Sequence, residues 1–180
     1  MLYLFLATGF EEIEALATID ILRRSGLNVR TVSVMKERRV VGAHGIPVEA
    51  DSLYGDSSLE DAQALILPGG MPGAKNLLEH EALGETLLSQ HNRGGLVAAI
   101  CAAPMVLGHL GILKNRRATC YPGFESELKG ADCQSDLTVV DGNVITGKGP
   151  GAVVDFAFAI AAKFVAEEVL DDLKEGMILK

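Results

Sequence analysis

The stretch Leu96-Val97-Ala98-Ala99-Ile100-Cys101-Ala102-Ala103-Pro104 joins an uninterrupted apolar run to a segment with a helical pattern. A short apolar run without polar alternation is typical of a strand that is buried on both faces, as in a parallel sheet. The helix expected over residues 102–113 follows at once. Cys101 therefore occupies a tight strand-to-helix turn, the context of a nucleophile elbow that presents a side chain at the sheet edge.

The rest of the chain continues this alternation of strands and helices. We expect strands over residues 2–7, 27–35, 64–67, 96–100 and 118–121, and hairpins over residues 40–50 and around the Asp141-Gly142-Asn143 turn. We expect helices over residues 11–25, 74–92 and 102–113, and one or two helices over 151–173. Apolar strands that alternate with helices predict a three-layer α/β/α sandwich with a mainly parallel sheet.

Length and composition fit one globular domain over residues 1–180, because 48% of the residues are apolar and 22% are charged. The net charge of −8 disfavours nucleic acid and anionic membranes as partners. Three cysteines without a C-x-x-C motif favour a reducing compartment. The apolar start is short and reads as a buried strand rather than a signal peptide. We therefore expect a cytoplasmic protein.

Chemically active groups follow several of the expected strands. They are Glu11-Glu12-Ile13-Glu14, the turn Pro68-Gly69-Gly70, the thiol of Cys101 and the loop 147–151. Because the carboxyl ends of parallel strands share one sheet edge, these groups are expected to converge there. A helix N-terminus beside the sulfur is expected to lower the pKa of Cys101. The alternative is a small buried hydrophobic residue, a common fate of cysteine, and spacing alone leaves both interpretations open.

Four motifs in order carry a resemblance to the ThiJ/PfpI family of the glutamine amidotransferase-like superfamily. They are Glu11-Glu12-Ile13-Glu14, Leu67-Pro68-Gly69-Gly70 with Gly73-Ala74, residues 98–104, and Thr146-Gly147-Lys148-Gly149-Pro150-Gly151. The chain is most similar to the branch that contains the parkinsonism-associated protein deglycase. The resemblance implies a flavodoxin-like, class I glutamine amidotransferase-like fold and a homodimer.

The resemblance also implies a site and an activity. Cys101 is then an oxidation-prone nucleophile, Glu14 the carboxyl that hydrogen-bonds its sulfur, and Gly69, Gly70 and Ala102 the backbone around a developing oxyanion. The implied activity is a cysteine-dependent, glutathione-independent glyoxalase or protein deglycase, acting on methylglyoxal, glyoxal or early glycation adducts of proteins without cofactor or metal. A carboxyl close to a thiolate is expected to have a raised pKa, which suits Glu14 to moving protons.

The sequence departs from relatives of this family at informative places. Tyr121 stands before Pro122 where several members carry a histidine, and tyrosine is a poor base near neutral pH. Ala102 stands where the protease-like branch carries a histidine, so a cysteine peptidase is less favoured. His44, in a turn, is a secondary candidate for substrate contact, with a solvated surface position as the favoured alternative. Asp20 either supports the site or pairs with an arginine on its own helix.

A non-enzymatic function competes with the glyoxalase. In a redox-responsive chaperone or oxidative-stress sensor, Cys101 is oxidised to sulfenic and then sulfinic acid. A sensor changes state once, whereas an enzyme turns over many equivalents. The four histidines lack ligand spacing, so no metal site is expected.

Overall fold

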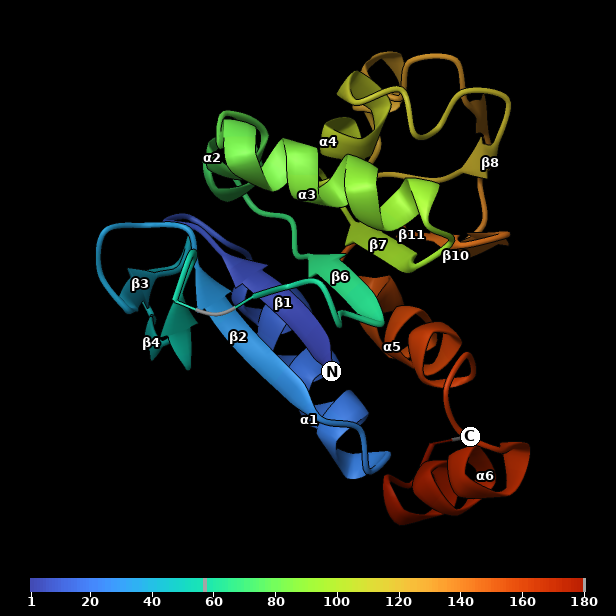
Figure 1. The fold of residues 1–180 in the computed structure, drawn as a ribbon. Coiled ribbons are helices and arrows are strands. Elements are labelled where there is room, and N and C mark those ends of the chain that lie inside the picture. The colour runs from blue at the N-terminus through green and yellow to red at the C-terminus, as the bar shows by residue number, and fades with distance from the viewer. Residues whose placement is uncertain (57, 180) are drawn as a thin grey trace.

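One seven-stranded sheet organises the computed structural model, which describes residues 1–56 and 58–179 (Figure 1). The strand order is β10-β11-β7-β6-β1-β2-β5. These strands are β1 (Leu2–Leu6), β2 (Val29–Ser33), β5 (Ser52–Leu53), β6 (Ala64–Leu67), β7 (Leu96–Ile100), β10 (Thr138–Asp141) and β11 (Val144–Gly147). All neighbouring pairs are parallel except β10–β11, which is an antiparallel hairpin.

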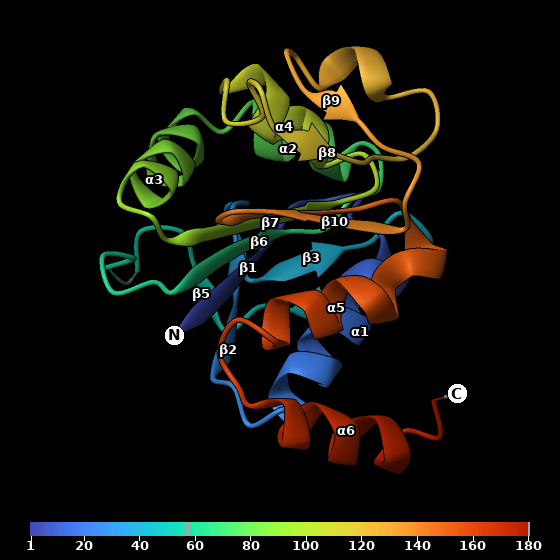
Figure 2. The same ribbon diagram turned by 90° about the vertical axis from the view of Figure 1, so that its right-hand side faces the viewer.

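Helices cover both faces of the sheet (Figure 2). On one side lie α1 (Glu12–Arg24), α5 (Val153–Ala161) and α6 (Glu167–Gly176), and on the other α2 (Gly73–Leu78), α3 (Glu81–Asn92) and α4 (Pro104–His109). Two 3-10 turns, η1 (Glu125–Glu127) and η2 (Pro150–Ala152), lie in the connections. This arrangement confirms the flavodoxin-like three-layer sandwich with a mainly parallel sheet.

The apolar runs of the sequence become the centre of the core. Every residue of β1, β6 and β7 is buried, as expected for parallel strands covered on both faces. Helix α1 begins where the Glu11 carboxylate accepts a hydrogen bond from the Glu14 amide at 2.7 Å. Arg23 and Arg24 lie in the last turn, where their charge complements the helix dipole. These elements fix the carboxyl ends of β1, β6 and β7 side by side.

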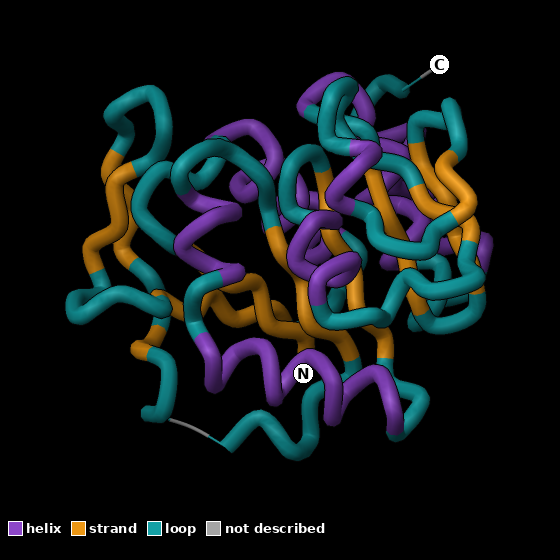
Figure 3. The backbone as a smooth tube through the Cα atoms, turned by 90° about the horizontal axis from the view of Figure 1, so that it is seen from above, coloured by secondary structure: helices purple, strands orange, loops and turns teal. Residues whose placement is uncertain are grey.

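Some boundaries differ from the sequence-based expectation. The helix predicted over 74–92 is two helices, because the His80 ring accepts a hydrogen bond from the Leu83 amide and starts α3 there. The strand predicted over 118–121 is only β8 (Arg117–Ala118), which pairs with the unpredicted β9 (Asp132–Cys133) outside the main sheet. The predicted hairpin over 40–50 is confirmed as β3 (Arg39–Val41) and β4 (Pro47–Glu49), at the left side of Figures 1 and 3.

Within the two described ranges, no helix combines the length and apolar character needed to cross a bilayer.

Candidate active site

Cys101 sits in a strained turn directly after β7. Its φ of 65° lies in the left-handed region, which is rare for residues other than glycine. The turn is held from both sides. The Cys101 amide donates to the carbonyl of Gly147 at 2.9 Å, and the Cys101 carbonyl accepts from the amide of Tyr121 at 2.8 Å. Strain of this kind persists only where surrounding contacts impose it, and it concentrates at functional sites.

The sulfur of Cys101 lies in a narrow, largely buried environment. The residue is 8% exposed, and the backbone amides of Gly70 and Ala102 lie near its sulfur and act to lower its pKa. Gly69 packs directly against the turn at Cys101. A Cβ added at Gly69 would lie 2.6 Å from the Cβ of Cys101 and 2.9 Å from the Ile100 carbonyl oxygen. The structure thus brings Cys101, Gly69, Gly70 and Ala102 together at one sheet edge.

Glu14 approaches this sulfur from the first turn of α1. Its side chain is completely buried, and Oε2 accepts a hydrogen bond from the Gly69 amide at 2.8 Å. Oε1 makes no hydrogen bond of good geometry, so the neighbouring Cys101 thiol is the group able to donate to it. Burial raises the pKa of Glu14 to about 7, although the Cys101 thiol and the Gly69 amide act in the lowering direction. The expected raised pKa is therefore present, with burial rather than a thiolate as its main cause.

The expected lowering of the Cys101 pKa is not found. Burial raises the pKa of the Cys101 thiol to about 12, and the negative charge of Glu14 adds to this effect. The amides of Gly70 and Ala102 act in the lowering direction but do not compensate. Helix α4 begins only at Pro104, so its N-terminus lies beyond the sulfur. The pair therefore rests with its proton on sulfur, and Glu14 is the group that titrates near neutral pH.

A shallow cavity of about 280 Å³ opens at Tyr121, whose amide is bonded to the Cys101 carbonyl, but Cys101 itself does not line it. It is bounded by Tyr121, Pro122, Leu137 and the loop 148–152. Tyr121 is 46% exposed, and its ring lies against the backbone of Gly149. Because the Tyr121 amide is bonded to the Cys101 carbonyl, this cavity is fixed relative to the nucleophile.

Asp20 lies outside the site. Its carboxylate accepts a hydrogen bond from Nε of Arg24 at 2.6 Å, and both side chains are exposed on α1. The pairing between positions four apart on a helix explains the residue locally. Of the two roles considered for Asp20, the structure supports the ion pair.

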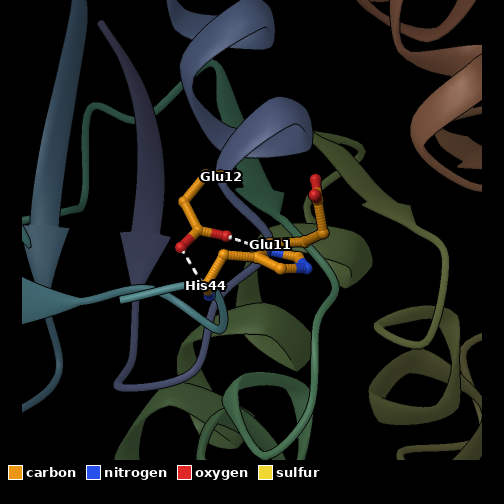
Figure 4. A group of neighbouring side chains, drawn as sticks. All are labelled: Glu11, Glu12 and His44. Atoms are coloured by element: carbon orange, nitrogen blue, oxygen red, sulfur yellow. Dashed lines mark hydrogen bonds and ion pairs between the residues drawn. The ribbon is translucent and has the colours of Figure 1, made fainter. Parts of the chain in front are cut away.

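His44 pairs with Glu12 at the start of α1 (Figure 4). The buried Glu12 carboxylate accepts from the His44 backbone amide at 2.7 Å and lies 2.7 Å from Nδ1 of its exposed ring. This pairing raises the pKa of His44. Burial acts to raise the pKa of Glu12, but the hydrogen bonds from His44 outweigh it and lower that pKa. The pair ties the β3–β4 loop to the start of α1.

Glu11, Glu12 and His44 also place one potential ligand atom each within 4.8 Å of one another (Figure 4). Both oxygens of Glu12 already bind the His44 loop, and one oxygen of Glu11 caps α1. The sequence did not indicate this cluster, because Glu12 and His44 lie on separate elements with no local pattern that links them. The expectation of no metal site stays a prediction.

Comparisons with known proteins agree with this geometry. The model of the DJ-1/PfpI family matches residues 1–163. The chain is 37% identical over 184 residues to the Parkinson disease protein 7 homolog of Danio rerio, covering 97% of this chain and 95% of that protein. It is 35% identical over 171 residues to the glutathione-independent glyoxalase DJR-1.2 of Caenorhabditis elegans, covering 94% and 90%.

Solved structures show the same fold. A crystal structure of a mutant DJ-1 superfamily protein from Salmonella typhimurium superposes with a TM-score of 0.95 at 34% identity, covering 99% of this chain and 98% of that one. Oxidised DJ-1 of Toxoplasma gondii superposes with a TM-score of 0.94 at 31% identity, covering 99% and 97%. The match extends over nearly the whole chain, including every element that positions Cys101.

Proposed function

Because the chain belongs to the DJ-1/PfpI family, we propose that it is a glutathione-independent glyoxalase and protein deglycase. Its substrates are methylglyoxal, glyoxal and their early adducts on proteins. The observation that carries the proposal is the buried pair of Cys101 and Glu14, in which burial raises the pKa of the carboxyl to about 7. A proton carrier is most effective when its pKa lies near the working pH.

The first step is addition of the thiol to the aldehyde. The Cys101 sulfur forms a bond to the aldehyde carbon while its proton passes to Glu14. Glu14 then gives this proton to the former aldehyde oxygen, which completes the hemithioacetal and leaves Glu14 as a carboxylate for the next step. The negative charge that develops on the aldehyde oxygen is stabilised by the amides of Gly70 and Ala102, which lie near the sulfur. This transfer allows a thiol of high pKa to react without a free thiolate in the resting enzyme.

The following steps move hydrogen between the two substrate carbons. Glu14 removes the proton from the carbon bonded to sulfur and returns a proton to the neighbouring carbon, which gives a thioester of a 2-hydroxy acid. Water then cleaves the carbon–sulfur bond, releases the acid and returns the proton to Cys101. The overall reaction adds water to the dicarbonyl, so that methylglyoxal gives lactate and glyoxal gives glycolate. It involves no net oxidation and uses no cofactor.

The cavity at Tyr121 is small, and neither Cys101 nor Glu14 lines it. Its volume of about 280 Å³ is below or near the lower end of the range for drug-sized ligands. The phenol of Tyr121 at its border can donate a hydrogen bond but is a poor base near pH 7. We assign the proton transfers to Glu14 and only a binding contact to Tyr121.

The decisive experiment measures lactate formed from methylglyoxal without glutathione. Cys101→Ser is expected to abolish turnover. Glu14→Gln is expected to reduce it by roughly 100-fold to 10,000-fold, the usual contribution of general acid–base catalysis. Asp20→Asn is the matched control, because it changes an exposed carboxyl on the same helix. Absence of turnover in reduced, folded wild-type protein would refute the proposal for methylglyoxal.

A redox response is the second candidate. It is supported by the position of Cys101 in its elbow at the sheet edge, where the residue is 8% exposed, and by the oxidised state named for the Toxoplasma gondii relative. Peroxide would convert the Cys101 thiol to sulfenic and then sulfinic acid, with hydrogen bonds from Gly70 and Ala102. Intact mass after peroxide titration, compared with Cys101→Ser, identifies this chemistry, and the lactate assay separates it from turnover.

We also propose a cytoplasmic homodimer. Ile13 and Leu16 of α1 and Ile46 of the β3–β4 loop are exposed apolar side chains, and the Ile46 amide reaches the start of α1 through Glu12 at 3.4 Å. An apolar face of this kind is typical of an interface. Light scattering should give a dimer for the wild type and a monomer for Ile13→Glu, whereas a monomeric wild type would refute the assembly.

A further inference from the structure

The cysteines other than Cys101 lie together outside the main sheet. Cys133 ends β9, and its register partner on β8 is Ala118, two residues before Cys120. The Gln134 amide donates to the Ala118 carbonyl at 2.8 Å, which holds the two segments side by side. The chain between them makes an excursion over residues 121–132 that contains η1. Cys120 and Cys133 thus lie at the two ends of the segment 121–132.

Both thiols border the same cavity, of about 360 Å³, together with Glu125 and Lys148. Cys120 is 4% exposed, whereas Cys133 is exposed. The Cys133 thiol donates a weak hydrogen bond to the Glu125 carbonyl at 3.8 Å. Both cysteines are reduced and unpaired in the structure. The cavity therefore contains one accessible and one protected thiol.

We propose that Cys120 and Cys133 form a disulfide by exchange with a low-molecular-weight disulfide, as a redox site separate from Cys101. The Cys133 thiolate attacks one sulfur of the small disulfide, which releases one thiol and leaves a mixed disulfide. The Cys120 thiolate then attacks the Cys133 sulfur and releases the second small thiol. Two protons pass from the protein to the released thiolates, and the protein loses two electrons to the small disulfide.

The order of attack follows from exposure. A small disulfide reaches Cys133 from solvent, whereas the protected Cys120 is reached by a sulfur that is already inside the cavity. Closure requires the two backbones to approach disulfide distance, with Cα atoms about 4.4–6.8 Å apart. Strand β9 has only two residues, both exposed, so it can move toward Cys120 without disturbing the core.

Charge in the cavity affects the rate of closure. Burial raises the pKa of Cys120 and of Cys133, and the nearby Glu125 acts in the same direction on both. Asp132 also raises the pKa of Cys133, and the Cys133 thiolate that of Cys120. Lys148 acts in the opposite direction on Cys120. Because thiolates carry out the exchange, closure is expected to accelerate as the pH rises above neutrality. This site does not depend on the proposed glyoxalase activity.

The test uses glutathione disulfide and the full-length Cys101→Ser chain, which retains only the two thiols in question. Trypsin cuts after Arg117, Lys129 and Lys148, and so separates Cys120 and Cys133 into peptides 118–129 and 130–148. After alkylation, the expected result is loss of both free thiols and a linked pair of these peptides, which dithiothreitol separates. In Cys101→Ser/Cys133→Ser the link and the loss of the Cys120 thiol should both disappear.

Two results would overturn the proposal. One is a persistent glutathione adduct on Cys133 while Cys120 remains alkylatable. The other is a link between Cys101 and Cys120 in the wild-type chain under the same conditions. Cys133→Ser is the informative variant, because Cys133 is exposed and its replacement is expected to leave the core intact. Circular dichroism of each variant confirms that thiol counts are compared between folded chains.

Discussion

Replacing Glu14 with glutamine is expected to stabilise the protein at alkaline pH while it strongly reduces activity. The carboxyl is completely buried, and burial raises its pKa from 4.5 to about 7. One pKa unit corresponds to about 1.4 kcal/mol, so ionising this group in the folded chain costs about 3 kcal/mol of the free energy of unfolding. Glutamine keeps an oxygen for the Gly69 amide and carries no charge to bury.

The sign of the pH dependence follows from proton binding. Between pH 4.5 and about 7, the folded chain retains a proton on Glu14 that the unfolded chain has released. Stability of the wild type therefore falls as pH rises through this window. The advantage of Glu14→Gln should be small near pH 4, grow through the window and reach its full size at about pH 8.

Urea unfolding of both proteins at several pH values, with reductant present, measures this difference. Glu12→Gln is the matched control, because hydrogen bonds from His44 lower the pKa of Glu12 despite its burial. That variant should be less stable than wild type near neutrality, and its deficit should fade in acid. The reasoning would be refuted if Glu14→Gln showed no gain at pH 8, or the same gain at pH 4 and pH 8.

Further predictions concern the turn, the surface of α1 and the β3–β4 loop. Gly69→Ala should destabilise the fold by about 1–3 kcal/mol through overpacking and abolish lactate formation, whereas the Gly176→Ala control meets no atom within 4 Å. Chemical denaturation of the two variants measures the difference in their free energies of unfolding, and equal stability of Gly69→Ala and Gly176→Ala would contradict the prediction. Asp20→Asn should lower the free energy of unfolding by at most about 0.5 kcal/mol, as for exposed helix ion pairs, and leave lactate formation unchanged. A large loss of activity would instead indicate that Asp20 supports the active site. NMR titration should place the pKa of His44 above its ordinary value and return it toward that value in Glu12→Gln, and an unchanged titration would exclude the pairing.

Much of the fold could be predicted because its signals are local. Runs such as residues 96–100 carry no polar alternation, and only a strand covered on both faces accommodates them. The elbow at Cys101 is local as well, since strand, cysteine and helix follow one another directly. The left-handed φ of 65° at Cys101 agrees with that interpretation. Local signals thus specified both the sheet and the place of the nucleophile.

Features made by contacts between distant segments could not be predicted in this way. The pairing of Glu12 with His44 joins α1 to the β3–β4 loop, and no spacing rule connects these positions. The parallel β8–β9 pair depends on the path of the intervening segment 121–132, which brings β9 back beside β8. The pKa of Cys101 was predicted in the wrong direction, because the turn suggested a helix dipole while the number of atoms around the sulfur was unknown. Burial is a property of the whole fold.

The distribution of the proton between Cys101 and Glu14 favours carbonyl chemistry over a resting redox sensor. Oxidation by peroxide requires a thiolate, and burial together with the charge of Glu14 keeps the thiol protonated. Addition to an aldehyde needs only a base that accepts the proton as the bond forms, and then an acid that returns it. A carboxyl whose pKa burial brings to about 7 fills both roles at neutral pH. Protonation of Glu14 by its own reaction also removes the nearby charge that raises the Cys101 pKa, so the pair is poised to react when a carbonyl group occupies the site.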